Sequence, residues 1–318
     1  MKTYIINRLL LMILTLFGMS VVIFVLLRLA PGNIVDILFD SAGYVDPYEK
    51  KVLEKELGLD QPVYIQYTRW MGALLSGDMG KSYRLEIPAW DVIKPRIPVS
   101  FELAMLALIF SIIFGIPPGV ISAVKQDTTL DYVLRIISLS GLSMPSFWLG
   151  LLIILGFVYN TDLSPIYINA PTDFWGHVLL FGVPAASVGF RASALLMRLT
   201  RSSMLEVMRQ DYIRTAKSKG LAENVINYRH ALKNAILPVV TVIGIEAAFL
   251  VGGLVVTESV FNIPGVARFL VQAILWRDYP VVQNLVMFIA VIVVTVNLLT
   301  DLTYMWLDPR LQLSGSPS

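Results

Sequence analysis

The stretch from Leu9 to Leu27, LLLMILTLFGMSVVIFVLL, contains 19 residues and no charge, and it decides the class of this protein. At about 1.5 Å per residue, such a helix is long enough to cross a hydrocarbon core of about 30 Å. Lys2 and Arg8 precede the run, as in a signal peptide. However, a signal peptide has an apolar region of only about 7–15 residues, and Leu29-Ala30-Pro31 is a poor cleavage site. We therefore predict an uncleaved first membrane helix.

Composition supports the same class for the whole chain. Of its 318 residues, 56% are hydrophobic and 15% are charged, whereas a soluble domain has about 25% charged residues. The net charge of +2 excludes nucleic-acid binding through a basic face. The absence of cysteine excludes disulfides and thiolate sites. His177 and His230 lie 53 residues apart, and because the sequence places no carboxylate partners near them, we expect no metal site.

Five further apolar segments predict an all-α integral membrane protein with six transmembrane helices and both termini on one side. The segments are Leu103–Val124, Ile136–Asn160, Phe174–Phe190, Ala235–Phe261 and Leu285–Leu307. The fourth is the weakest because it contains His177 and Pro184, and the fifth contains Glu246 near its middle.

The distribution of basic residues predicts the orientation. The segment Arg198–Pro238 holds eight basic and three acidic residues, whereas Pro31–Pro98 holds ten acidic and eight basic residues. Since Lys and Arg are enriched on the cytoplasmic side, we expect both termini and the basic loop to be cytoplasmic. The predicted organisation is a single membrane domain over 1–318, with a first span at 1–30, an external amphipathic segment at 31–98, and a five-span core at 99–318 that carries a cytoplasmic loop at about 199–238.

The external segment is expected to form two amphipathic helices. One follows Asp46-Pro47 and covers Glu49–Leu57, and the other covers Val63–Ser76. These helices could lie on the bilayer surface or form a docking surface for an external partner. Gly80-Lys81-Ser82 does not form a phosphate loop, because Leu75 occupies the position where that motif requires glycine.

The basic loop contains the most informative pattern. A helix is expected over Ser203–Lys219, ended by Gly220, and a second helix is expected from Ala222 towards Pro238. Two short helices joined at a glycine would form a rigid, basic helical hairpin. The alternative is an ordinary positively charged loop with no partner.

Two stretches of this loop resemble the EAA loop of ABC-importer permeases. They are DYIRTAKSKGL at Asp211–Leu221 and RHALKNAILP at Arg229–Pro238. The chain is most similar to the first-subunit type of the dipeptide/oligopeptide/nickel permease family. Further motifs that resemble this family occur in order at Arg28–Gly32, Gly77–Ser82, Ser143–Trp148, Glu258–Gly265, Arg277–Pro280 and Asp308–Arg310. Arg214 and Thr215 replace the usual glutamate and alanine, which looks like a feature of the peptide branch rather than of sugar permeases.

The resemblance implies a type I ABC importer permease fold in a bacterial or archaeal inner membrane. The implied partners are a second homologous permease, one or two kinds of cytoplasmic ATPase that bind ATP and Mg, and an external substrate-binding protein. This chain would hold no cofactor and would not itself be an enzyme. The resemblance assigns contact with the ATPase to Tyr212, Arg214, Thr215, Ala216, Lys217, Lys219, Gly220 and Leu221. Small residues there would allow close approach, and Pro238 would link the turn to the fifth span.

The translocation path is expected to involve Glu246, with Arg191 as a possible partner, and Ser143 and Ser146 beside a helix break. A carboxylate at mid-membrane depth should face the bundle interior. It could be a structural acid or a pore-lining group that attracts cationic substrates. Peptides are the favoured substrates, with nickel chelates or oligosaccharides as alternatives. An ion-coupled secondary transporter and a membrane-embedded enzyme are the rival classes.

Overall fold

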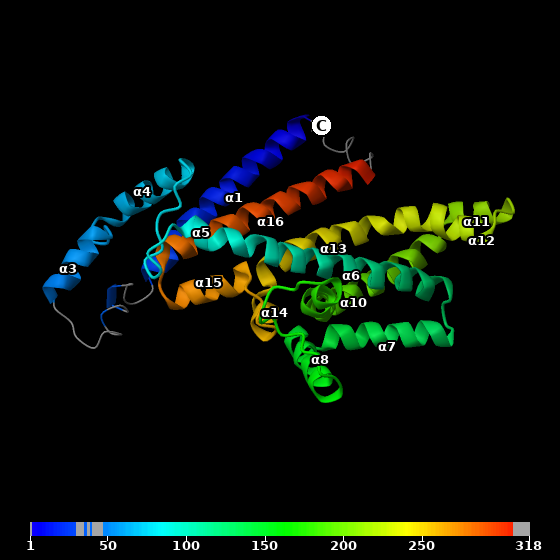
Figure 1. Cartoon of the computed structure of the whole chain (residues 1–318). Coiled ribbons are helices and arrows are strands. Elements are labelled where there is room, and N and C mark those ends of the chain that lie inside the picture. The colour runs from blue at the N-terminus through cyan, green and yellow to red at the C-terminus, as the bar shows by residue number, and fades with distance from the viewer. Residues whose placement is uncertain (1, 30–34, 37–38, 40–46, 308–318) are drawn as a thin grey trace. The chain divides into compact units, whose positions relative to one another are not determined.

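The computed structural model describes residues 2–29, 35–36, 39 and 47–307, and within these ranges every regular element is a helix (Figure 1). The proposed cap at Asp46 and the motif at Asp308–Arg310 lie outside the described residues. The chain divides into two compact units. Unit 1 comprises residues 1–99 and 264–292, and unit 2 comprises residues 100–263 and 293–318.

Unit 1 contains the first span and the helices of the segment 31–98. Its elements are α1 (Lys2–Leu29), α3 (Pro47–Glu56), α4 (Val63–Leu75), α5 (Ala89–Ile93), the 3₁₀ turn η1 (Lys94–Arg96), α15 (Val266–Leu275) and the first half of α16 (Tyr279–Leu307). The two predicted external helices correspond closely to α3 and α4. A core of Val92, Phe269 and Val282 packs α5, α15 and α16 together.

Two of the motifs quoted above meet in unit 1. Asp278 is 1% exposed, and its carboxylate accepts a hydrogen bond from the Ser82 hydroxyl. It also accepts bonds from the backbone N–H groups of Tyr83 at 3.2 Å and Arg84 at 3.3 Å. A buried carboxylate requires such donors, so the segment after α4 is fixed to the start of α16.

Unit 2 contains the helices that lead to the basic loop. They are α6 (Ile97–Val124), α7 (Thr129–Ser143), α8 (Ser146–Asn160), α9 (Phe174–His177), the π-turn η2 (Val178–Gly182), α10 (Val183–Met208), α11 (Asp211–Ser218), α12 (Glu223–Val225), the π-turn η3 (Ile226–Ala231), α13 (Leu232–Gly253) and α14 (Val255–Val260). A Cβ atom on Gly119 of α6 would lie 2.7 Å from the Met197 carbonyl oxygen. Glycine is therefore needed where α6 approaches α10, as at many helix contacts in membranes.

The structure has the six predicted membrane spans if the bent pair of helices α7 and α8 is counted as one span. Within the described residues, five helices are long and apolar enough to cross a membrane. They are Ile6–Leu29, Ala89–Val124, Phe174–Met208, Glu223–Gly253 and Tyr279–Thr303. Pro117 and Pro118 lie inside α6 and do not interrupt the helix.

The third predicted span, Ile136–Asn160, is not a single straight helix but is divided between α7 and α8. Helices α7 and α8 meet at an angle of 104°. Met144 has an extended backbone, with ψ at 127°, because a residue before proline is disfavoured in the helical region. Pro145 then precedes the first residue of α8.

The predicted helix Ser203–Lys219 is also wrong, because the chain breaks at Gln210. Helix α10 ends at Met208, Gln210 is extended with ψ at 150°, and α11 starts at Asp211. An acidic residue at this position favours a new helix start. The second predicted helix starts after Ala222 and continues as a single helical stretch, Glu223–Gly253, with Pro238 inside it.

Candidate functional site: the turn after α11 and the buried ion pairs

The turn after α11 has the geometry of a helix C-cap. Gly220 has a φ of +74°. The N–H of Leu221 donates to the Ala216 carbonyl at 3.4 Å, and the N–H of Gly220 donates to the Lys217 carbonyl at 2.9 Å. This pair of bonds is the Schellman motif, in which the left-handed position is usually glycine. A Cβ atom at residue 220 would meet no atom within 4 Å, so the requirement for glycine is set by the backbone alone.

One face of α11 packs against its own chain. Ile213 is fully buried and Ala216 is 8% exposed. Both belong to an apolar cluster with Val120 of α6, Met204 of α10 and Ile226 of η3. The small size of Ala216 therefore serves the packing of α11 on unit 2, whereas the sequence-based expectation assigned it to the approach of a partner.

The other face of α11 and the turn are exposed to solvent, and we call them the outer face. It consists of Tyr212, Arg214, Thr215, Lys217, Lys219, Gly220 and Leu221. Some of these groups are engaged locally: the Tyr212 hydroxyl accepts a bond from Asn234 Nδ2 at 2.7 Å, and Arg214 pairs with Asp211 at 3.3 Å. In Figure 1, α11 and α12 both lie at one end of unit 2.

A buried acid that the sequence analysis missed lies at the start of α7. Asp131 is fully buried, and it accepts bonds from Arg201 Nε at 2.8 Å and Arg201 Nη2 at 2.7 Å. The Ser122 hydroxyl and the Asp127 N–H also donate to it. The carboxylate therefore joins the end of α6 and the start of α7 to α10, the helix that leads into α11 and the turn after it. Thr128 caps α7 by accepting the Asp131 N–H, and this Thr-x-x-Asp signature was the available sequence signal.

The structure brings Glu246 and Arg191 together. Arg191 Nη2 lies 3.1 Å and 3.3 Å from the two carboxylate oxygens of Glu246. The side chain of Glu246 is 8% exposed and that of Arg191 is 35% exposed. The more accessible group of this pair is therefore the guanidinium.

The two serines lie at the break between α7 and α8. Ser143 ends α7 and is exposed, and Ser146 begins α8 and is half-buried. Among the described residues, no hydrogen bond links either hydroxyl to the Arg191–Glu246 pair.

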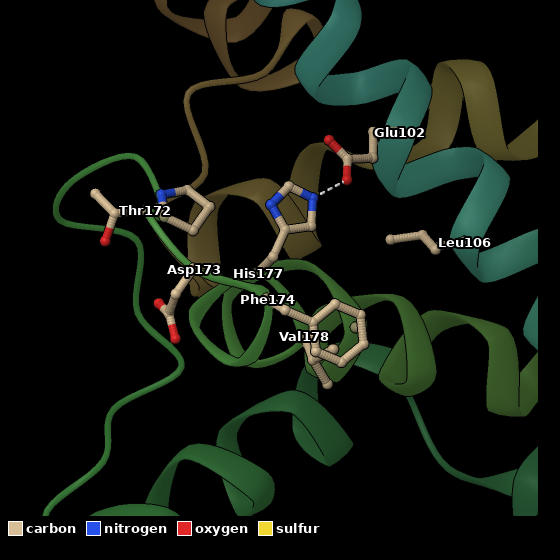
Figure 2. A pocket seen from close by; sticks show the side chains of 9 residues that line it. Glu102, Leu106, Thr172, Asp173, Phe174, His177 and Val178 are labelled. Carbon is tan, nitrogen blue, oxygen red and sulfur yellow. Dashed lines mark hydrogen bonds and ion pairs between the residues drawn. The ribbon is translucent and has the colours of Figure 1, made fainter.

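A second pair brings a carboxylate to His177, although the sequence places none near it. Figure 2 shows the His177 ring pointing at the Glu102 carboxylate in the wall of a cavity, and His177 Nε2 contacts Glu102 Oε1. The cavity has a volume of about 440 Å³. Phe181 stacks on the imidazole at 4.9 Å between ring centroids. The separation of 75 positions in the sequence explains why no local pattern reveals the contact. His230, by contrast, is half-buried in η3.

The chain matches two family models. Residues 115–313 match the inner membrane component of binding-protein-dependent transport systems, and residues 1–104 match the N-terminal part of such a membrane component. The chain is 38% identical to a dipeptide transport system permease protein of Alkalihalophilus pseudofirmus, with 98% of this chain and all of that one covered. It is 37% identical to the corresponding Escherichia coli protein, covering 98% and 99%, and 35% identical to an oligopeptide transport system permease protein of Bacillus subtilis, covering 98% and 100%. The chain therefore belongs to the family of inner membrane components of binding-protein-dependent transport systems, and it is a multi-pass inner-membrane protein.

Proposed function

We propose that the chain is a permease subunit of an ATP-driven importer for di- or oligopeptides, and that it forms half of the translocation pore. The observation that carries the substrate class is the similarity over nearly the whole chain to permeases named for dipeptides, di- and tripeptides and oligopeptides. A second homologous permease, one or two kinds of cytoplasmic ATPase that bind ATP and Mg, and an external binding protein complete the complex. The chain itself carries out no hydrolysis.

Coupling to the ATPase is assigned to the outer face. Lys217 and Lys219 present cations beside the apolar side chain of Leu221, which is 41% exposed. A rim of acidic residues on the ATPase would complement these cations. The hydrogen bond between Tyr212 and Asn234 connects α11 to α13. The continuous helical stretch Glu223–Gly253, which comprises α12, η3 and α13, would transmit a displacement of the turn into the membrane. A rigid helix that moves as one body is a known device for such switching.

Single-cysteine cross-linking tests this assignment, because the chain contains no cysteine of its own. We expect Lys219→Cys to form a cross-link to an ATPase subunit when the complete complex is treated with a short thiol-reactive reagent. Lys125→Cys, at an exposed residue of the α6–α7 connection, is the matched control and should give little product. Equal yields at both positions would place the contact elsewhere, and failure of the chain to co-purify with an ATPase would remove the importer assignment.

The Arg191–Glu246 pair is assigned to the border of the translocation path. Glu246→Gln leaves the arginine without its counter-charge. We expect a loss of about 1–3 kcal/mol of stability, which is less than for a fully buried pair because Arg191 is partly exposed. The double variant Arg191→Gln/Glu246→Gln should recover part of this loss, measured by thermal unfolding of the purified protein.

Uptake measurements separate this expectation from a direct role of the carboxylate. We expect Glu246→Gln to change the uptake of peptides with an extra lysine and peptides with an extra glutamate by similar factors. If stability is unchanged and only the lysine-containing peptides are slowed, then Glu246 attracts the cationic part of the substrate directly.

A further inference from the structure

Unit 2 contains a basic cavity between α7 and α10 that the proposed transport function does not use. Its volume is about 230 Å³. Helix α7 contributes Arg135 and Leu139 to the wall, and α10 contributes Arg198 and Arg201. The two residues from each helix are three or four positions apart, so they share one face of that helix. Among the described residues that line the cavity, three are arginines and none is acidic.

Arg135 and Arg198 supply positive charge that no carboxylate compensates. Both residues are exposed, and within the described part of the chain neither forms an ion pair. The Arg135 guanidinium lies over the Tyr132 ring, with 5.5 Å from its Cζ atom to the ring centroid. This contact engages the face of the guanidinium, so its N–H groups remain available as donors. The two arginines therefore give the cavity accessible donors and an excess of positive charge.

The acids near the cavity do not line it. Asp131 is fully buried, and its carboxylate accepts bonds from Nε and Nη2 of Arg201, so it compensates that arginine alone. Asp127, whose charge also acts on Arg201, lies in the α6–α7 connection, two positions from Lys125. The lining therefore favours an anion, and guanidinium groups bind phosphate oxygens through charge-assisted hydrogen bonds.

The surroundings of the cavity indicate which anion it binds. Helix α10 belongs to the membrane span Phe174–Met208, and α7 belongs to the bent pair that counts as one span. The α7 side chains of Ile136 and Leu139 are 63% and 59% exposed, and Leu139 also lines the cavity. The cavity therefore adjoins an exposed apolar surface on a membrane span, which is a surface suited to lipid acyl chains.

The depth of Arg135 fits a lipid headgroup. This residue lies roughly two turns after the start of α7, so its long side chain can extend to the level of the headgroups. Basic pockets between membrane helices are typical sites for anionic headgroups. We propose that Arg135 and Arg198 bind the phosphate of an anionic phospholipid whose acyl chains lie against the exposed face of α7. Such a site does not require the chain to be part of an importer.

Lipid retention on the purified full-length chain tests the site. The chain is exchanged into micelles that contain equal amounts of phosphatidylglycerol and phosphatidylcholine, and the bound lipid is counted by native mass spectrometry. Both lipids contain a phosphate, but the choline group of the second carries a cation that the arginines repel. We expect the wild type to retain phosphatidylglycerol preferentially.

Substitution of the two arginines should remove this preference. Arg135→Gln and Arg198→Gln each delete one charge and should each lower the preference on the order of tenfold, and the double variant should retain both lipids equally. Both residues are exposed and form no ion pair, so these variants should fold. Arg198→Lys keeps the charge and should keep most of the preference. Arg209→Gln, at an exposed residue that follows α10 and lies outside the cavity wall, is the matched control and should behave as the wild type.

Two further measurements identify the occupant. Inorganic phosphate is titrated into the lipid-free chain by calorimetry, and phosphate binding that Arg198→Gln abolishes, without a lipid preference, would keep the anion site but assign it to a soluble anion. Arg135→Cys is treated with a short thiol-reactive reagent in the complete complex, and a cross-link to another subunit would show that protein covers the cavity. That cross-link, a wild-type preference in the double variant, or equal retention of both lipids with no phosphate binding would overturn the proposal.

Discussion

Gly220→Val should abolish ATP-driven peptide uptake by the assembled importer while leaving the basal ATP hydrolysis of its ATPase subunits in place. Gly220 has a φ of +74°, which costs a residue with a Cβ roughly 1–2 kcal/mol and costs a β-branched residue more. No atom lies within 4 Å of the position that the new Cβ would occupy, so the strain is relieved by a change of the backbone. Such a change breaks the two bonds that close α11 and displaces the outer face.

Two comparisons separate this effect from a general loss of stability. Gly77→Val introduces valine at a φ of +84°, again with no atom within 4 Å, but in unit 1, directly after α4. We expect a similar fall in the unfolding temperature with most of the uptake retained. Gly220→Asn should retain uptake as well, since asparagine tolerates the left-handed conformation. Normal uptake by Gly220→Val would exclude the turn as the coupling element.

Asp131→Asn should cause the largest loss of stability of any variant considered for unit 2. The carboxylate is fully buried and accepts two bonds from Arg201, whose side chain is 20% exposed. Removing one partner of a buried ion pair costs about 3–5 kcal/mol, because the other charge is left without compensation. The loss should appear as a lower unfolding temperature of the purified protein.

The matched control is Asp211→Asn, which makes the same chemical change in the Asp211–Arg214 pair. The Asp211 side chain is 95% exposed, and an exposed pair and a charge in the first turn of a helix each contribute at most about 1 kcal/mol, so only a small change is expected. Adding Arg201→Met to Asp131→Asn should restore part of the stability, because it removes the unpaired cation. A wild-type unfolding temperature for Asp131→Asn would show that Asp131 does not hold α7 on α10.

The helical content could be predicted because a bilayer imposes strict rules. A spanning segment must be long, apolar and internally hydrogen-bonded. Leu9–Leu27 and Leu103–Val124 satisfy these rules without ambiguity, and they correspond to parts of α1 and α6. The end of α11 at Gly220 could be predicted equally well, since the positive φ that closes a helix is a local requirement that glycine meets.

The two wrongly predicted helices, Ile136–Asn160 and Ser203–Lys219, are each divided by a break that composition does not reveal. The apolar run Ile136–Asn160 is uniform in composition, but Pro145 divides it because it restricts the residue before it. The break at Gln210 is similarly hidden, because neither glycine nor proline marks it; Asp211, the first residue of α11, is the one local sign of a new helix start.

Arg191 was anticipated from the sequence as a possible partner of Glu246, whereas the pairing of Asp131 with Arg201 required the tertiary structure. Arg201 and Asp131 are 70 residues apart, and Arg191 and Glu246 are 55 residues apart. A charge in a membrane helix predicts that a partner exists, as Glu246 did, but helix packing decides which residue it is.

Uptake of a labelled dipeptide into reconstituted vesicles tests the importer assignment most directly. The vesicles contain this chain with its partner permease and ATPases, and the binding protein and ATP are supplied on their respective sides. We predict that accumulation requires ATP and every subunit, and that Gly220→Val reduces it to the level without ATP. Accumulation by vesicles that contain this chain alone, driven by an ion gradient in the absence of ATP, would contradict that assignment.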